Sequence, residues 1–244
     1  RIIPPTVERA SWHMSVDNAI IKKMSQGLQK DEEVFPTFRL YKFSRHAVVL
    51  GRLQHPEKID YELAKRNNVD TTTRLTGGGA FYTTQNELHM SIVAPLEIFP
   101  KDLQQRYLMI NSLIADALKK IGLDAYAKRT SVRIGEDKRL FVSGQATTAD
   151  GVLYYHGSLH VNFDIEFWKK LLKATSEEIQ KINSGKIVLL SEISKQYEIQ
   201  REKLEKEIYN SFIQKICNGN YREGMLTQDE IQSAKEFQQT IYDN

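Results

Sequence analysis

The chain has 244 residues and a formal net charge of +3, with 34 Lys and Arg residues mixed among 31 Asp and Glu residues. Its 41% hydrophobic content is enough to bury a substantial core, whereas the small and dispersed charge argues against a nucleic-acid-binding protein. No apolar run approaches the roughly 20 residues of a membrane helix, the first residues lack a signal-peptide pattern, and a single cysteine, Cys217, excludes an internal disulfide and a cysteine-based zinc site. We therefore expect a protein that does not enter a membrane and that is cytoplasmic, or organellar after processing.

The first 95 residues predict two helices among several strands. Trp12, Val16, Ile20 and Met24 recur at four-residue intervals, so residues 11–27 should form an amphipathic helix. A proline begins the second helix, which is expected over residues 56–67. Apolar runs and alternations predict strands at 37–43, 46–51, 71–82 and 88–94, the third of them interrupted by glycines.

The rest of the chain adds a long helix, a group of strands and a helical tail. The apolar residues of 101–120 share one helix face, and Gly122 is suited to end that helix. Strands are expected at 132–134, 140–146 and 151–161, and the chain should be mainly helical from about residue 165. This order indicates an α+β fold with a mixed or antiparallel sheet and helices packed mainly on one face. No change in composition divides the chain, so residues 1–244 are expected to form a single domain.

The most informative segment is Arg74-Leu75-Thr76-Gly77-Gly78-Gly79-Ala80-Phe81-Tyr82, followed by Asn86. Each glycine costs backbone entropy and has no side chain to bury. Three in succession between strand-like segments therefore indicate a place where the backbone comes close to a ligand. A flexible linker would instead continue into Ser, Pro or charged residues.

The region from Val48 to Pro95 resembles the signature of the lipoate-protein ligase A family in order, spacing and residue type. The family pattern reads Gly-Arg-x-Gln-Asn, then a helix, then Arg-Arg-x-Ser-Gly-Gly-Gly-Ala-Val-Tyr-His-Asp-x-Gly-Asn. The residues assigned from this match to a pocket for the acyl group or its adenylate are Arg52, Gln54, Arg74, Thr76, Gly77, Gly78, Gly79, Ala80, Tyr82 and Asn86.

A second match lies at residues 142–146 and 156–159, which resemble the family's Lys-x-Ser-Gly-x-Ala and His-His-Gly-Thr-Leu. It adds Ser143, Gly144, Ala146, His156 and Gly157 to the same pocket. Residues 226–244 resemble the end of the ligase catalytic domain, so the resemblance covers nearly the whole chain. The separate C-terminal domain of many ligases is not expected here.

The chain departs from the family at Phe141, which stands where the family has its catalytic lysine. A phenyl ring cannot stabilise phosphate charge, so Arg139, on the same expected strand face, and Lys138 become the candidate catalytic residues. Two further departures concern residues 83–84, Thr-Thr in place of His-Asp, and residues 130–132, Thr-Ser-Val in place of Asn-Asp-Ile. The family aspartate helps to position magnesium or nucleotide, and we assign no residues to a resident metal ion.

The resemblance implies a lipoate-protein ligase or lipoyltransferase. In that chemistry the carboxylate of lipoate attacks the α-phosphate of ATP, supplied as its Mg²⁺ complex, and the lipoyl-AMP acylates a lysine of an acceptor lipoyl domain in an E2 subunit or H-protein. Backbone N–H groups of the glycine turn suit the phosphate, with Arg74 as a fixed positive charge. A separate accessory protein that supplies the C-terminal domain would fit the length of the chain.

Two alternatives stay open. One is a non-catalytic homologue that binds the acyl group or adenylate, or that pairs with an active paralogue; Phe141 is its main support. The other is an octanoyltransferase that uses acyl carrier protein, but relatives of that kind form an acyl-thioester on a cysteine, and Cys217 lies far from the signature strands in the sequence. The residues alone do not distinguish lipoyl, octanoyl and biotinyl groups.

Overall fold

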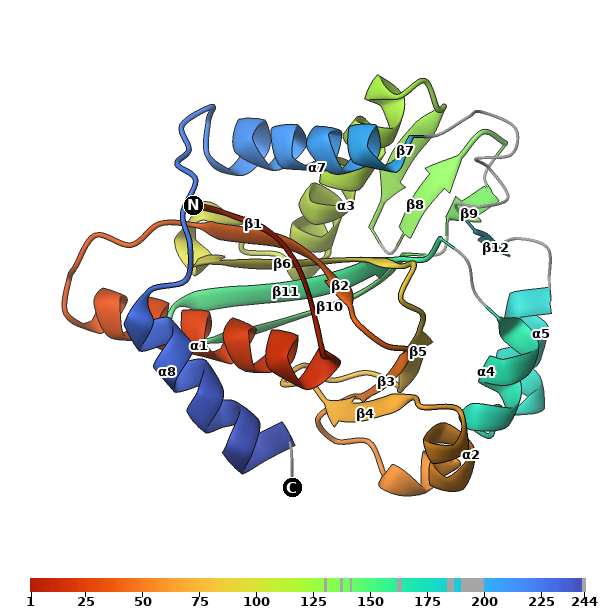
Figure 1. Cartoon of the computed structure of the whole chain (residues 1–244). Helices are drawn as coiled ribbons and strands as arrows, with labels where there is room; N and C mark the ends of the chain where they lie inside the picture. Colours follow the sequence, from red (N-terminus) through yellow and green to blue (C-terminus); the bar gives the residue numbers. More distant parts are fainter. Residues whose placement is uncertain are drawn as a thin grey trace.

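A five-stranded sheet runs through the centre of the molecule (Figure 1). The structure is a computed structural model that describes residues 1–129, 131–136, 138–140, 142–161, 164–183, 187–189 and 200–242. In spatial order the strands are β1 (Ile2–Glu8), β2 (Thr37–Phe43), β6 (Leu88–Pro95), β11 (Val152–Leu159) and β10 (Val142–Ala149). β1 runs parallel to β2 and the other neighbours are antiparallel, so the sheet is mixed, as predicted.

Two pairs of helices cover the two faces of this sheet (Figure 1). They are α3 (Leu103–Lys120) with α7 (Arg201–Ile216), and α1 (Ala10–Gln29) with α8 (Gln228–Phe237). Side chains alternate along each strand, so Met90 and Ile92 of β6 pack with α3 and α7, whereas Val93 packs with α1 and α8. The predicted α+β class is confirmed. The expected placement of helices mainly on one face needs correction, because both faces carry apolar side chains that require cover.

Two smaller sheets flank the central one. β4 (Asp70–Thr73), β3 (Ala47–Leu50) and β5 (Phe81–Thr83) form the first, and β12 (Ile187–Val188), β9 (Lys138–Leu140), β8 (Ser131–Ile134) and β7 (Ala125–Lys128) form the second. The shorter helical elements are η1 (Pro56–Lys58), α2 (Tyr61–Arg66), η2 (Leu96–Ile98), α4 (Ile165–Leu171), α5 (Ser176–Asn183) and η3 (Gln238–Tyr242). Within the described part of the chain, no helix combines the length and the hydropathy that a membrane span needs.

The sequence predicted one strand over residues 71–82 that the glycines interrupt. The structure instead has two separate strands, β4 before the glycines and β5 after them. β4 and β5 both pair with β3, but on its two opposite edges and in opposite directions. Residues 74–80, called the glycine loop from here on, therefore carry the chain from one edge of β3 to the other. The predicted continuous strand over 71–82 is wrong, because an apolar pattern shows which residues are extended but not which edge of a neighbour they join.

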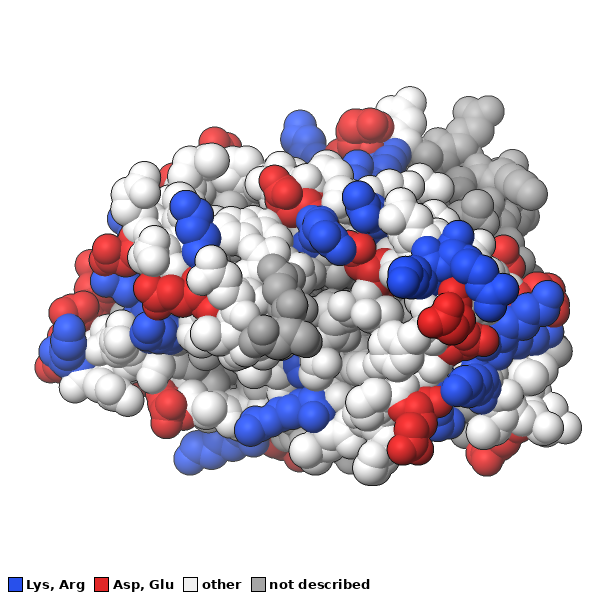
Figure 2. Space-filling view, turned by 60° about the horizontal axis from the view of Figure 1, so that its bottom comes forward, with Lys and Arg blue, Asp and Glu red and all other residues white. Residues whose placement is uncertain are grey.

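Charges of both signs are interspersed over the face shown in Figure 2. Exposed pairs such as Lys23 and Asp229, 3.8 Å apart, contribute little to stability because water screens them. A different kind of pair lies between α1 and the central sheet. The side chains of Asp17 and Arg39 are 0% and 4% exposed, and Arg39 donates a hydrogen bond to the carboxylate.

Asp17 joins helix α1 to three strands of the sheet. Besides Arg39 of β2, its carboxylate accepts hydrogen bonds from Ser91 Oγ of β6 at 2.7 Å and from the Tyr154 hydroxyl of β11 at 2.9 Å. Burial raises the pKa of Asp17, and the charge of Arg39 opposes that rise. Because all these donors meet at one carboxylate, the network fixes the position of α1 on the sheet.

Asp17→Ala should lower the free energy of unfolding by about 3–5 kcal/mol, because it leaves the Arg39 guanidinium buried without its carboxylate. Urea denaturation at neutral pH measures the change. The control Lys23→Ala removes an exposed ion pair and should cost less than about 1 kcal/mol. Equal losses for the two variants would show that the network does not hold α1.

Candidate functional site

The guanidinium of Arg74 holds the glycine loop from inside. Arg74 is 3% exposed. It donates from Nη2 to the carbonyl oxygens of Gly77 at 2.7 Å and Gly79 at 2.8 Å, and from Nη1 to that of Val49 at 2.9 Å. Burial lowers the pKa of Arg74 to about 10, so the group stays charged at neutral pH. The residue thus binds the backbone of its own loop.

Because its carbonyl groups point inward, the loop turns its N–H groups outward. The C=O and N–H of a trans peptide point in opposite directions, and no cis peptide occurs in the described chain. The carbonyls of Gly77 and Gly79 face Arg74, so the N–H groups of Gly78 and Ala80 face away from it. These N–H groups, with that of Gly79, donate to no other described residue, and the three glycines are exposed. Free N–H groups beside a buried cation form a site for an anion.

Gly77, Gly78 and Gly79 differ in whether the structure requires a glycine at that position. A Cβ on Gly51, which directly follows β3, would lie 2.0 Å from the carbonyl oxygen of Gly78, so the loop packs where Gly51 has no side chain. Gly78 has a φ of +91°, and a Cβ on it would lie 3.1 Å from the carboxamide of Gln145. A Cβ on Gly77 or Gly79 would meet no described atom within 4 Å. The middle glycine therefore serves the fold, and the outer two leave open space beside the loop.

His156 of the central sheet contacts the glycine loop through a hydrogen bond with Thr76. Thr76 is fully buried, accepts from Arg74 Nε at 3.1 Å, and lies with its hydroxyl 2.5 Å from Nε2 of His156. Burial, with Arg74 adding to the effect, lowers the pKa of His156 to about 3. The imidazole is therefore neutral, and its Nε2 shares a hydrogen bond with the Thr76 hydroxyl. His156, which the sequence assigns to the ligand pocket, lies behind the loop at 5% exposure.

The second matched segment lies on two paired strands. Gly144 of β10 and Gly157 of β11 are direct partners, as predicted for adjacent strands. A Cβ on Gly144 would lie 2.2 Å from the Tyr155 hydroxyl, so this glycine makes room for a tyrosine. Ala146 is half-buried, and its backbone N–H donates to the Tyr107 hydroxyl at 3.0 Å. The side chain of Ser143 lies outside the described part of the structure.

Gln145 lies beside the loop, although the family match assigns only its neighbours Gly144 and Ala146 to the pocket. It pairs with His156 in the β10–β11 ladder, and its side chain is half-exposed. Alternation along a strand places Gln145 on the face opposite to Gly144 and Ala146, and Ala146 indeed packs with the α3 and α7 core. That alternation was the signal in the sequence that would have identified Gln145.

Arg52 and Gln54 follow β3 and lie next to the loop through backbone contacts. The N–H of Arg52 donates to the carbonyl of Thr76 at 3.0 Å, and its side chain is exposed. The N–H of Gln54 donates to the carbonyl of Gly51 at 2.9 Å. Oε1 of Gln54 is buried and has no hydrogen-bond partner among the described residues. The structure therefore brings both residues to the loop, as the matched spacing predicts.

The residues after the loop anchor it. Tyr82 is 2% exposed, and its hydroxyl lies 2.6 Å from Nδ1 of His46. Its ring packs edge-on against Phe167 of α4, with centroids 5.3 Å apart. Burial raises the pKa of Tyr82 to about 12, so the hydroxyl is neutral. Ala80 is partly buried and packs against the apolar cluster that contains Tyr82 and Phe167.

Thr83 and Thr84, which replace the family's His-Asp pair, are both buried. Thr84 Oγ1 donates to Oε1 of Glu87 at 3.1 Å, inside the protein. Asn86 is exposed, and its carbonyl accepts a hydrogen bond from Arg201 of α7 at 2.6 Å. Among the described residues, no three His, Cys, Asp or Glu side chains gather as a metal site would require.

The most consequential departure cannot be placed. Phe141 and Thr130 lie outside the described residues, and so do the side chains of Lys138 and Arg139. The backbone shows that β9 and β10 belong to different sheets, so the predicted continuous strand over 140–146 is wrong. The chain changes sheets at that point. A catalytic role for Lys138 or Arg139 stays a prediction.

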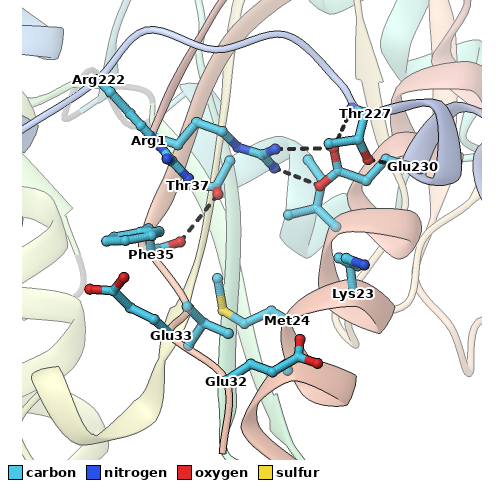
Figure 3. Close-up of a pocket in the computed structure, with 13 residues that line it drawn as sticks. Arg1, Lys23, Met24, Glu32, Glu33, Phe35, Thr37, Arg222, Thr227 and Glu230 are labelled. Carbon is cyan, nitrogen blue, oxygen red and sulfur yellow. Dashed lines mark hydrogen bonds and ion pairs between the residues drawn. The ribbon is translucent and has the colours of Figure 1, made fainter. Parts of the chain in front are cut away.

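A cavity of about 200 Å³ lies elsewhere, between the end of α1, the start of β2 and α8 (Figure 3). Arg1 and Glu230 form a salt bridge at its edge, with Nη2 and Oε1 2.7 Å apart. Its other labelled residues include Lys23, Glu32 and Phe35. Among the residues that the structure describes, the lining contains none of the matched signature. We therefore place the candidate site at the glycine loop.

Comparison with known proteins connects this loop to a family. A family model described as the lipoyl protein ligase A/B catalytic domain matches residues 9–213. The chain is 23% identical over 237 residues to lipoate-protein ligase A subunit 1 of Thermoplasma acidophilum, which covers 92% of this chain and 86% of that protein. It is 27% identical over 264 residues to octanoyltransferase LipM of Clostridioides difficile, covering 97% of this chain and 94% of that protein.

Solved structures show the same fold. The bipartite lipoate protein ligase of Thermoplasma acidophilum, studied with its E2 lipoyl domain, superposes with a TM-score of 0.82 at 20% identity, covering 98% of this chain and 92% of that chain. A lipoate-protein ligase A bound with ATP superposes with a TM-score of 0.79 at 20% identity, covering 98% and 94%. The expected fold of a lipoate ligase catalytic domain is thereby confirmed.

Gly78→Ala should lower the free energy of unfolding by about 1–3 kcal/mol, because its φ of +91° disfavours a side chain. Gly79→Ala, which adds the same methyl group into open space, should change stability by less than about 0.5 kcal/mol. Urea denaturation of both variants measures the difference. Equal effects would contradict the separate structural reasons given to the two glycines.

The protein should lose stability in mild acid because its buried histidines stay neutral. The pKa values of His156 and His160 are lowered to about 3, mainly by burial. The unfolded chain binds these protons below pH about 6.5, so the free energy of unfolding should fall by up to about 1.4 kcal/mol per pH unit for each histidine between pH about 6 and 4. Urea titrations across this range, with the exposed His55→Asn as control, measure the slope. His156→Asn should reduce that slope, and an unchanged slope would contradict a neutral His156.

Proposed function

The chain belongs to the lipoyl protein ligase A/B catalytic domain family, and from this premise we propose that it transfers a lipoyl group from lipoyl-AMP to a lysine of an acceptor lipoyl domain. In the first half-reaction the lipoate carboxylate displaces pyrophosphate from ATP, which enters with Mg²⁺. In the second, a lysine amine attacks the lipoyl carbonyl and AMP leaves with the phosphate oxygen. The geometry of the glycine loop supports the second half-reaction most directly.

The observation that carries this proposal is the outward-facing row of N–H groups on the loop. Three unpaired backbone donors lie on an exposed turn, and the charged Arg74 stands directly behind them. Such an arrangement suits the phosphate of an adenylate and the AMP leaving group. The open space beside Gly77 and Gly79 leaves room for that ligand.

The partners in this proposal follow from relatives. The Thermoplasma ligase of the same fold is bipartite and was studied with an E2 lipoyl domain. By analogy, this chain would act on a lipoyl-domain acceptor, an E2 subunit or an H-protein, and would work with a separate accessory protein. We place this activity in the cytoplasm.

Octanoyl transfer is the second candidate, because relatives named octanoyltransferase LipM align over nearly the whole chain. A transfer through an acyl-thioester needs a reactive thiolate at the site. The only cysteine, Cys217, caps the end of α7 and packs with the α3 and α7 core. Burial raises the pKa of Cys217, which opposes thiolate formation. These facts favour lipoyl transfer without a covalent cysteine.

The test is the intact mass of an acceptor lipoyl domain after incubation with this chain and one acyl donor. Lipoyl-AMP should give a mass gain of one lipoyl group, and Cys217→Ser should give the same gain, because no thioester is needed. Octanoyl-acyl carrier protein should give none. A gain from the carrier protein that Cys217→Ser abolishes would replace this proposal with octanoyl transfer, and no gain from any donor would favour a non-catalytic binder.

A parallel reaction with lipoate, ATP and Mg²⁺ tests the activation step. If Phe141 is an uncompensated loss of the family lysine, Phe141→Lys should raise the rate of adenylate formation by about 10²-fold or more. Pyrophosphate release measures that rate. A parent chain already as fast as the variant would mean that another cation, Arg139 or Lys138, supplies the missing charge.

A further inference from the structure

We infer that Gln145 binds the ligand, and that its carboxamide donates a hydrogen bond to an anionic oxygen of the acyl or acyl-adenylate molecule beside the glycine loop. The inference rests on the proposed function and assigns a role to Gln145, which stands at a variable position of the matched signature. It follows from the position of Gln145 and from the hydrogen bonds that the surrounding groups have already made.

The sheet fixes the position of Gln145. It lies on β10 opposite His156, in the regular antiparallel ladder with β11. Its carboxamide lies against Gly78, where a Cβ on that glycine would be 3.1 Å from both Cδ and Nε2. The side chain is half-exposed and makes no hydrogen bond with the described residues. A strand-borne amide with unused donors therefore lies directly beside the loop.

The two buried polar side chains that hold the loop, Arg74 and Thr76, already have partners within the protein. Arg74 gives its Nη donors to the carbonyls of Val49, Gly77 and Gly79. Thr76 accepts a hydrogen bond from Nε of Arg74 and shares a second one with Nε2 of His156. Neither side chain can turn to a ligand without releasing the loop.

This leaves two kinds of donor for an anionic ligand within the described part of the site. The first is the row of backbone N–H groups, and the second is the side chains of Arg52, Gln54 and Gln145, of which Gln54 has its Oε1 buried. Arg52 is exposed on a loop, and ordering its long side chain costs rotamer entropy. Gln145 projects from a paired strand and its carboxamide already lies against Gly78, so its position beside the loop is set by the fold.

Gln145 is neutral, which makes its role distinguishable from that of a cation. A carboxamide can donate to an oxygen or accept from an N–H, whereas a carboxylate of the same shape can only accept and carries a negative charge. Gln145→Met removes both functions at nearly the same length. Gln145→Glu can still accept a hydrogen bond, but its negative charge repels an anionic ligand.

The experiment is isothermal titration of the full chain with lipoate and with a non-hydrolysable lipoyl-AMP analogue that keeps its phosphate. Gln145→Met should raise Kd by about five- to tenfold, the usual effect of losing one hydrogen bond. Gln145→Glu should raise it by at least a further tenfold or so, because two negative groups then meet. The matched control Gln26→Glu changes an exposed glutamine on α1 and should leave Kd unchanged.

The outcomes separate this inference from the proposed function. If the parent chain binds neither ligand, the proposed function fails and the inference with it. If the parent binds and both variants bind equally well, only the role of Gln145 is overturned. If Gln145→Glu keeps parental affinity while Gln145→Met loses it, the amide is an acceptor and the inference is also wrong. A thermal melt confirms folding, and Gln145→Met alone decides the question if Gln145→Glu does not fold.

Discussion

The hydrogen bonds from Arg74 to the carbonyls of its own loop set the chemistry of the candidate site. A guanidinium is planar and carries five donors in a fixed fork, so it can hold several carbonyl oxygens at once. In this chain it holds those of Val49, Gly77 and Gly79. Every carbonyl drawn inward turns the N–H of the same peptide outward. The positive charge of Arg74 therefore lies directly behind the backbone donors that it orients.

The central sheet supports this arrangement through one transverse row of polar side chains. Gln145, His156, Ser91 and Arg39 stand opposite one another on β10, β11, β6 and β2. Within this row His156 forms a hydrogen bond with Thr76 of the loop. Ser91 and Arg39 bind the carboxylate of Asp17 in α1. The same face of the sheet thus carries the support of the site and the attachment of α1. Stability and site geometry are linked through neighbouring strands.

Sequence patterns predicted the features that depend on local periodicity and on the glycines. The helices at 11–27 and 101–120, the mixed sheet and the exposed glycine turn all follow from residues close together in the chain. The sequence did not reveal that β4 and β5 lie on opposite edges of β3, because an extended segment with this apolar pattern can pair with either edge of a strand. Nor did it reveal the burial of Arg74. Its partners are backbone carbonyls, which every residue has, so no particular residue type in the sequence indicates them. The partners of Asp17 are 22 to 137 residues away along the chain, beyond any local pattern.

Phe141 affects the two half-reactions of the proposed function differently. In the proposed function, binding of an adenylate depends on the loop N–H groups and on Arg74, none of which requires a lysine at position 141. Formation of the adenylate instead depends on stabilising charge that develops only in the transition state, where a positioned cation has its largest effect. A chain with this loop and a phenylalanine at that position should therefore keep affinity for lipoyl-AMP while losing speed in making it. The second half-reaction has less need of the lysine, since in the proposed function the loop binds the phosphate that leaves with AMP. For this reason we place the proposed activity at transfer from a preformed adenylate.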